Sequence, residues 1–137
     1  MALELTDAQV SGNKVGELVE IYQEFTFDAA HHFPGAPKGH LYHGLHGHSF
    51  TARIVLRGPK NPETGFIADL GDVEARCGQL RLLLDHKYLN DIDGLNNPSL
   101  ENIAAWIWTR LKADLPALAR VEVRRDSCHH GCAYEGG

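Results

Sequence analysis

The chain has 137 residues, of which 43% are hydrophobic and 23% charged, and its net charge is −5 when histidines are counted as neutral. This composition predicts one globular domain with a substantial core, and it excludes a broad basic surface for nucleic acid or for an anionic membrane. The three cysteines, Cys77, Cys128 and Cys132, are too few and too unevenly spaced for a disulfide framework, which favours a reducing compartment.

The first 18 residues show no sustained hydrophobic periodicity, and Ser11, Gly12 and Asn13 interrupt them. We expect an N-terminal arm over residues 1–18 and a single domain over residues 19–137. The sequence contains neither the continuous apolar core of a signal peptide nor an apolar stretch as long as a membrane span. The cytoplasm is therefore the expected location.

Two long runs of alternating polarity open the domain, over residues 19–31 and 45–58. Alternation of this kind predicts half-buried strands, because successive side chains of a strand point to opposite faces. The in-phase positions of the first run end at His31, and those of the second begin with His46 and His48. If the runs pair as an antiparallel hairpin, these three histidines converge on one apolar wall.

Three neutral imidazoles on one wall are the ligand set of a catalytic zinc, which keeps a fourth coordination position open. The chain has nine histidines, so the His46-Gly47-His48 pair alone is also consistent with ordinary core histidines. The matching phase of His31 favours the metal site. The connection between the runs is long for a hairpin and rich in glycine and proline, which is typical of a functional loop.

Two amphipathic helices are predicted next. Asp69 fits a helix N-cap, and Cys77 lies on the apolar stripe of that helix, so we assign it to the core. Asn97 or Ser99 opens the second helix, which ends before Pro116. The stripes are Leu70, Val73, Cys77, Leu80 and Leu84 in the first helix, and Leu100, Ile103, Ala104, Ile107, Trp108 and Leu111 in the second.

Short strands over residues 121–124 and 132–134 complete the pattern. The order strand, strand, helix, helix, strand, strand predicts an α+β fold, with a four-stranded antiparallel sheet and two helices on one of its faces.

Two further groups carry chemistry. Asp85 precedes His86, and a carboxylate beside an imidazole can fix its tautomer and raise its basicity. Cys128 and Cys132, with two histidines between them, could form a second metal site, although their spacing is not that of zinc knuckles. A turn leading into an edge strand is the alternative for this segment.

Five motifs occur in the order typical of one enzyme family. They are residues 25–31 (FTFDAAH), 45–50 (LHGHSF), 64–69 (TGFIAD) and 84–91 (LDHKYLND), followed by Cys128-x-x-Gly131-Cys132. In these motifs the chain resembles the 6-pyruvoyltetrahydropterin synthase and 6-carboxytetrahydropterin synthase (QueD) family. The likeness runs from about residue 20 to the C-terminus, and it is strongest to the bacterial 6-carboxytetrahydropterin synthases of queuosine biosynthesis.

This resemblance implies a T-fold (tunnelling-fold) subunit whose sheets assemble into a barrel, usually in a homohexamer with active sites at subunit interfaces. It implies that His31, His46 and His48 bind Zn²⁺, and that Asp85 and His86 transfer protons. The implied activity is that of a zinc-dependent carbon-carbon lyase. It acts on 7,8-dihydroneopterin triphosphate, a small-molecule pterin, to give 6-carboxy-5,6,7,8-tetrahydropterin.

The sequence departs from the family pattern at two positions. Tyr42 stands where the family has its catalytic cysteine, and forming the tyrosine anion costs roughly 2 kcal/mol more than forming the thiolate. Tyr42 is still the candidate acid or base, with His43 as the alternative if the loop shifts by one residue. Asp126 aligns with the glutamate that binds the pterin ring, and we expect it to take that role with two N–H bonds to its carboxylate.

These departures leave two other functions open. One is a related pterin side-chain aldolase that gives 6-hydroxymethyl-dihydropterin, because some relatives without the cysteine work in this way. The other is a non-catalytic paralogue that binds zinc and pterin.

Overall fold

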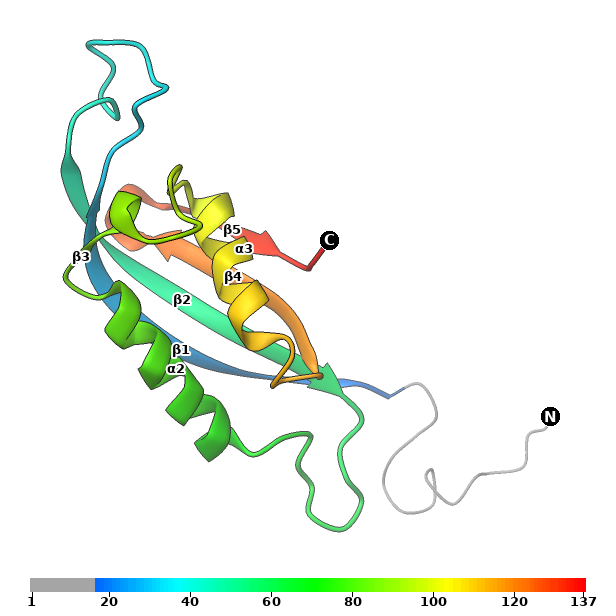
Figure 1. The fold of residues 1–137 in the computed structure, drawn as a ribbon. Helices are drawn as coiled ribbons and strands as arrows, with labels where there is room; N and C mark the ends of the chain where they lie inside the picture. Colours follow the sequence, from blue (N-terminus) through cyan, green and yellow to red (C-terminus); the bar gives the residue numbers. More distant parts are fainter. Residues whose placement is uncertain (1–16) are drawn as a thin grey trace.

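The computed structural model describes residues 17–137, so the arm predicted over residues 1–18 lies almost wholly outside the described part. Figure 1 shows one curved sheet with two helices packed on the same face. The strands are β1 (Val19–His31), β2 (His46–Gly58), β3 (Lys87–Tyr88), β4 (Leu118–Arg125) and β5 (His130–Tyr134). The helices are α2 (Leu70–Leu84) and α3 (Leu100–Leu111), with short 3-10 turns η1 (Leu89–Asp91) and η2 (Asp126–Cys128).

Strands β1 and β2 form the predicted long antiparallel hairpin. The strands pair antiparallel, with His31 opposite His46 and Ala29 opposite His48. One row of the hairpin carries Phe27 and Phe50, whose rings stack with centroids 4.9 Å apart under the helices. This apolar row continues into the histidines, so the alternation that builds the core also positions the candidate metal ligands.

Each helix begins at a predicted cap. The side chain of Asp69 accepts a hydrogen bond from the Gly71 N–H at 2.9 Å, and Ser99 accepts one from the Asn102 N–H at 3.1 Å. The predicted stripes are buried except at their margins, because Leu70 is 44% exposed and Trp108 is only partly buried. Both helices cover the same core.

The sheet has five strands in the order β3-β1-β2-β4-β5, so the prediction of four strands is wrong. The additional strand, β3, pairs parallel with Ala29 and Ala30 of β1. It contains only two residues, which is too short to show a periodicity, and the sequence therefore predicted a plain connection there. Within residues 17–137, each helix is too short or too polar to cross a bilayer.

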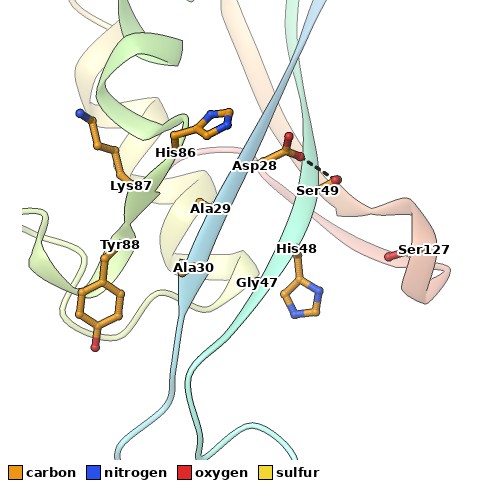
Figure 2. Close-up of a pocket in the computed structure, with 10 residues that line it drawn as sticks. All are labelled: Asp28, Ala29, Ala30, Gly47, His48, Ser49, His86, Lys87, Tyr88 and Ser127. Atoms are coloured by element: carbon orange, nitrogen blue, oxygen red, sulfur yellow. Dashed lines mark hydrogen bonds between the residues drawn. The ribbon is translucent and has the colours of Figure 1, made fainter.

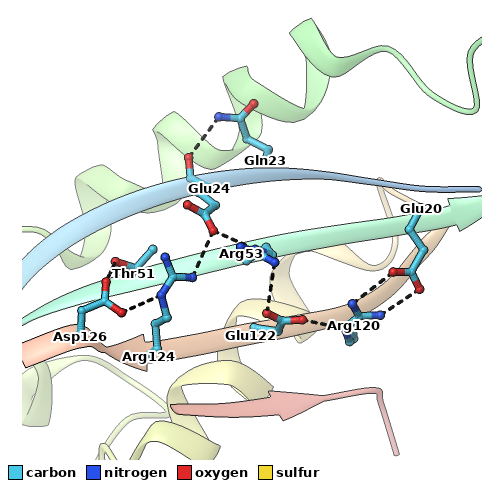
Figure 3. Close-up of polar contacts among 9 residues, drawn as sticks. All are labelled: Glu20, Gln23, Glu24, Thr51, Arg53, Arg120, Glu122, Arg124 and Asp126. Carbon is cyan, nitrogen blue, oxygen red and sulfur yellow. Dashed lines mark hydrogen bonds and ion pairs between the residues drawn. The ribbon is translucent and has the colours of Figure 1, made fainter. Parts of the chain in front are cut away.

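The face of the sheet away from the helices is charged. Its ion pairs join β1, β2 and β4, as Figure 3 shows. We call this surface the charged face and define it by Glu20, Glu24, Arg53, Arg120, Glu122, Arg124 and Asp126.

Candidate metal centre and adjoining groove

The three predicted ligands converge at the end of the β1–β2 hairpin. One ligand atom from each of His31, His46 and His48 lies within 4.8 Å of the others. The ring centroids are 4.5 to 5.1 Å apart. Within residues 17–137 this is the one group of histidine, cysteine or acidic side chains with such an arrangement. The second metal site considered at Cys128 and Cys132 is not among such groups in the described part of the chain.

Backbone carbonyls fix two of the imidazoles. His31 Nδ1 donates to the carbonyl of Pro98 at 3.0 Å, and His46 Nδ1 donates to that of Gly44 at 2.8 Å. A carbonyl can only accept, so each Nδ1 carries a proton, and in the neutral ring the lone pair is then on Nε2. Both Nε2 atoms are buried without a partner. Two orphaned lone pairs beside a third imidazole fit a metal ion, whose histidine ligands are commonly oriented through their other ring nitrogen.

Two of the imidazoles, those of His31 and His48, favour the neutral state that a metal requires. Burial lowers the pKa of His31 to about 4, opposed by its bond to the Pro98 carbonyl. Burial also lowers the pKa of His48 to about 4, and the positive charge of Arg125 adds to this effect. Both rings are therefore uncharged near pH 7.

Arg125 adjoins the cluster and was missed by the sequence analysis. It follows Val121 and Val123 in the helix-facing row of β4, and it is only 8% exposed. Its Nη1 donates to His48 Nε2 at 3.3 Å, and its Nε is buried with no partner. The alternation of V-x-V-x-R could have revealed it, because an arginine there occupies a position that the pattern assigns to the core.

Tyr42 lies beside His46, at the edge of the histidine cluster. Its ring centroid is 5.8 Å from that of His46, and the Arg125 guanidinium is 5.8 Å from the same tyrosine ring. Cys128 approaches from η2, with Sγ 3.9 Å from His48 Nδ1. His43 points elsewhere, because its Nδ1 contacts the Ala36 carbonyl at 2.9 Å.

Asp85 and His86 form the predicted pair beside β1. One oxygen of Asp85 accepts from the Asp28 N–H at 2.8 Å, and the other lies 2.9 Å from His86 Nδ1 and 3.1 Å from Arg81. The bond from the Asp28 N–H, then that from His86, lowers the pKa of Asp85, which is ionised near neutral pH. His86 has a positive φ of 60° and a side chain that is 78% exposed.

A groove of about 710 Å³ connects His86 with the metal centre, because His48 and His86 both line it. Figure 2 shows Ser49 of β2 hydrogen-bonded to Asp28 of β1 among the lining residues, with Lys87 and Tyr88 contributed by β3. His31 and His46 do not line this groove, so His48 is the cluster histidine that faces it.

Asp126 lies away from the three histidines. Its carboxylate accepts from Thr51 at 3.2 Å and from Arg124 at 2.8 Å, on the charged face (Figure 3). Within one chain it is thus on the other side of the sheet from the cluster, and its role in pterin binding stays a prediction.

Comparisons with known proteins agree with this architecture. The family model described as 6-pyruvoyl tetrahydropterin synthase matches residues 20–137. The chain is 40% identical to a 6-carboxy-5,6,7,8-tetrahydropterin synthase from Synechocystis, over 83% of this chain and 91% of that protein. It is 35% identical to a dihydroneopterin monophosphate aldolase from Pyrococcus furiosus, over 77% and 84% of the respective chains.

A solved structure shares the fold. The 6-pyruvoyl tetrahydropterin synthase of Caenorhabditis elegans superposes with a TM-score of 0.78 at 21% identity, covering 88% of this chain and 97% of that one. With the family model matching nearly all of the described residues, the chain belongs to the 6-pyruvoyl tetrahydropterin synthase family.

Proposed function

We propose that this chain is a zinc-dependent carbon-carbon lyase that converts 7,8-dihydroneopterin triphosphate to 6-carboxy-5,6,7,8-tetrahydropterin. The observation that carries the proposal is the pair of orphaned Nε2 atoms of His31 and His46 beside the ring of His48. The 40% identity to the Synechocystis 6-carboxy-5,6,7,8-tetrahydropterin synthase supports this choice of reaction.

In this proposal His31, His46 and His48 hold Zn²⁺, since three neutral imidazoles are a typical ligand set of catalytic zinc. When bound, the zinc acts as a Lewis acid that acidifies the carbon positions next to the side-chain oxygens of the substrate. The hydrogen bonds to Pro98 and Gly44 keep two rings oriented for this role.

Proton transfer falls to Asp85, His86 and Tyr42. The ionised Asp85 holds the proton on His86 Nδ1, which leaves the exposed Nε2 free to take a proton from a substrate in the groove. Tyr42, on the other side of the cluster, is the candidate for the second proton transfer. Lys87 lines the same groove and offers a positive charge for a phosphate.

The site would be completed by assembly. In the described part of the chain, residues 19–28 of β1 pair only with β2, and β5 pairs only with β4. Strands with one unpaired edge are ready to join strands of another copy. We therefore propose a homo-oligomer, a hexamer built around a barrel of sheets, with active sites at its interfaces and Asp126 binding the pterin ring there. The cytoplasm is the proposed location.

The test is product analysis by mass spectrometry of zinc-loaded protein incubated with 7,8-dihydroneopterin triphosphate. Appearance of 6-carboxytetrahydropterin supports the proposal, and loss of this product in the His86→Ala variant would support the proton-transfer role. Unchanged substrate, with zinc bound, would contradict the proposed activity.

A second function is an aldolase that releases 6-hydroxymethyl-dihydropterin. Its support is the 35% identity to the Pyrococcus furiosus aldolase, together with tyrosine in place of the family's cysteine. The Tyr42→Cys variant separates the two functions. A synthase with an altered acid or base gains activity from this change, whereas an aldolase that depends on Tyr42 loses its own product.

A further inference from the structure

Arg125 is a buried cation without an anionic partner. It is only 8% exposed, and within residues 17–137 no carboxylate forms an ion pair with it. Its Nε is buried and makes no hydrogen bond. The preceding residue, Arg124, is paired with both Glu24 at 3.1 Å and Asp126 at 2.8 Å. A buried charge is costly unless something neutralises it, so the unpaired guanidinium points to a ligand.

The guanidinium adjoins the metal centre. Its Nη1 lies 3.3 Å from His48 Nε2, and the ring of Tyr42 flanks it with the centroid 5.8 Å away. A metal ion held by His48 would bring a second positive charge close to Arg125. Because like charges repel strongly where water is excluded, the two cations are stable together when an anion lies between them.

We propose that Arg125 binds a carboxylate whose second oxygen reaches the metal held by His31, His46 and His48. The planar guanidinium fork matches a carboxylate, which can accept two parallel N–H bonds from it. The inference rests on the proposed function because it requires the metal, and it deepens that function. The 6-carboxylate of the proposed product has the chemistry that this subsite takes.

The experiment uses the full chain loaded with Co²⁺, whose visible spectrum reports on its ligands, and acetate as the probe. In the wild-type protein acetate changes the spectrum at concentrations that leave the metal bound. In Arg125→Met the dissociation constant of acetate rises at least about tenfold, the usual effect of losing one strong charge-assisted contact. The matched control, Arg124→Met, changes the adjacent arginine on the charged face and binds acetate as the wild type does.

A second measurement separates this role from a structural one. In acetate-free buffer, Arg125→Met binds Co²⁺ more tightly than the wild type, since a neighbouring positive charge has been removed. Arg125→Lys keeps the charge but not the fork, so its metal affinity stays unchanged while its acetate affinity falls. A merely structural arginine would give weaker metal binding in both variants, and that result would overturn the proposal.

The remaining outcomes are equally informative. If cobalt binds normally but acetate leaves the wild-type spectrum unchanged, this inference fails while the metal site stands. This measurement uses only the wild-type protein, so it does not depend on whether a variant folds. If acetate binds equally well to Arg125→Met and the wild type, the inference also fails. Tighter binding of inorganic phosphate than of acetate would overturn the carboxylate assignment. Failure to bind cobalt would overturn both this inference and the proposed function.

Discussion

On the helix-covered face of the sheet, Phe27, Phe50 and Ile54 are almost inaccessible to water. The row of side chains that holds Phe27 and Phe50 ends at the histidines. On the charged face, acidic and basic side chains pair across three strands (Figure 3). The two faces also differ in their buried polar side-chain atoms that lack a hydrogen-bond partner. Apart from Glu17 Oε1, which lies 3.8 Å from Lys60 Nζ, such atoms within residues 17–137 belong to His31, His46 and Arg125, all on the helix-covered face. The face that holds the apolar core therefore also holds the buried groups that lack a partner.

The largest expected effect on stability comes from a substitution in the core of the helix-covered face. Phe50 is 0% exposed and stacks on Phe27, so Phe50→Ala should lower the free energy of unfolding by about 3–5 kcal/mol, through lost burial and a cavity. Urea denaturation measures this value. Phe66→Ala is the control, because Phe66 is 68% exposed and its loss should cost less than about 0.5 kcal/mol. Similar losses for both variants would contradict the assignment of the core.

The next effect removes a metal ligand. His46→Ala should weaken zinc binding by more than about a hundredfold, which exceeds the usual effect of losing a residue that only supports a ligand. The fold should persist, since His46 is only partly buried. Elemental analysis and competition with a chelator measure the change. His130→Ala, which alters an exposed histidine of β5, should retain its metal. Equal zinc content in the two variants would refute the ligand assignment.

A third prediction concerns pH. The pKa values of His31 and His48 are lower in the folded chain than the ordinary value of 6.5, so the unfolded chain binds more protons as pH falls. The stability of the metal-free protein is thus complete above pH 6.5 and should decline by at most about 3 kcal/mol as pH falls toward about 4, with His31 contributing most because solvent screens the partly exposed His48. Urea denaturation across this range measures it. A doubly substituted His31→Gln, His48→Gln variant should have a flatter profile, and an equally steep one would contradict the assignment.

The smallest effect is expected on the charged face. Glu24 accepts from Arg53 at 2.8 Å and from Arg124 at 3.1 Å, and all three side chains are about one-third exposed. Glu24→Gln should therefore cost about 1 kcal/mol or less, and added salt should reduce the difference. A loss as large as that of Phe50→Ala would show that this face contributes more than paired surface charges can.

The hairpin and the helix caps could be predicted because each follows from a local rule. Alternation with a period of two fixes which residues share a face of the sheet. His31 and His46 therefore lie opposite each other on paired strands, as predicted. Asp69 and Ser99 were recognisable because short polar side chains satisfy the free N–H groups of a first turn.

Other features depend on contacts between distant segments. The Pro98 carbonyl that orients His31 lies 67 residues away in sequence, and β3 exists only because β1 offers it an edge. The consecutive residues Arg125 and Asp126 show most clearly what could not be predicted from the sequence. The resemblance assigns Asp126 to the pterin ring, which stays a prediction, and the chain places this carboxylate on the charged face and Arg125 beside the histidines. A shift of one residue along β4 moves a side chain from one face of the sheet to the other. Resemblance at a single residue therefore does not settle which face a side chain occupies.

The most direct test of the central claim is X-ray absorption spectroscopy at the zinc edge of the zinc-loaded protein. The account predicts three imidazole nitrogens at about 2.0–2.1 Å and one further oxygen ligand, as in catalytic zinc sites. The nitrogen scattering should be lost in His46→Ala. A sulfur ligand at about 2.3 Å would instead place the metal on Cys128 or Cys132 and contradict the assignment to His31, His46 and His48.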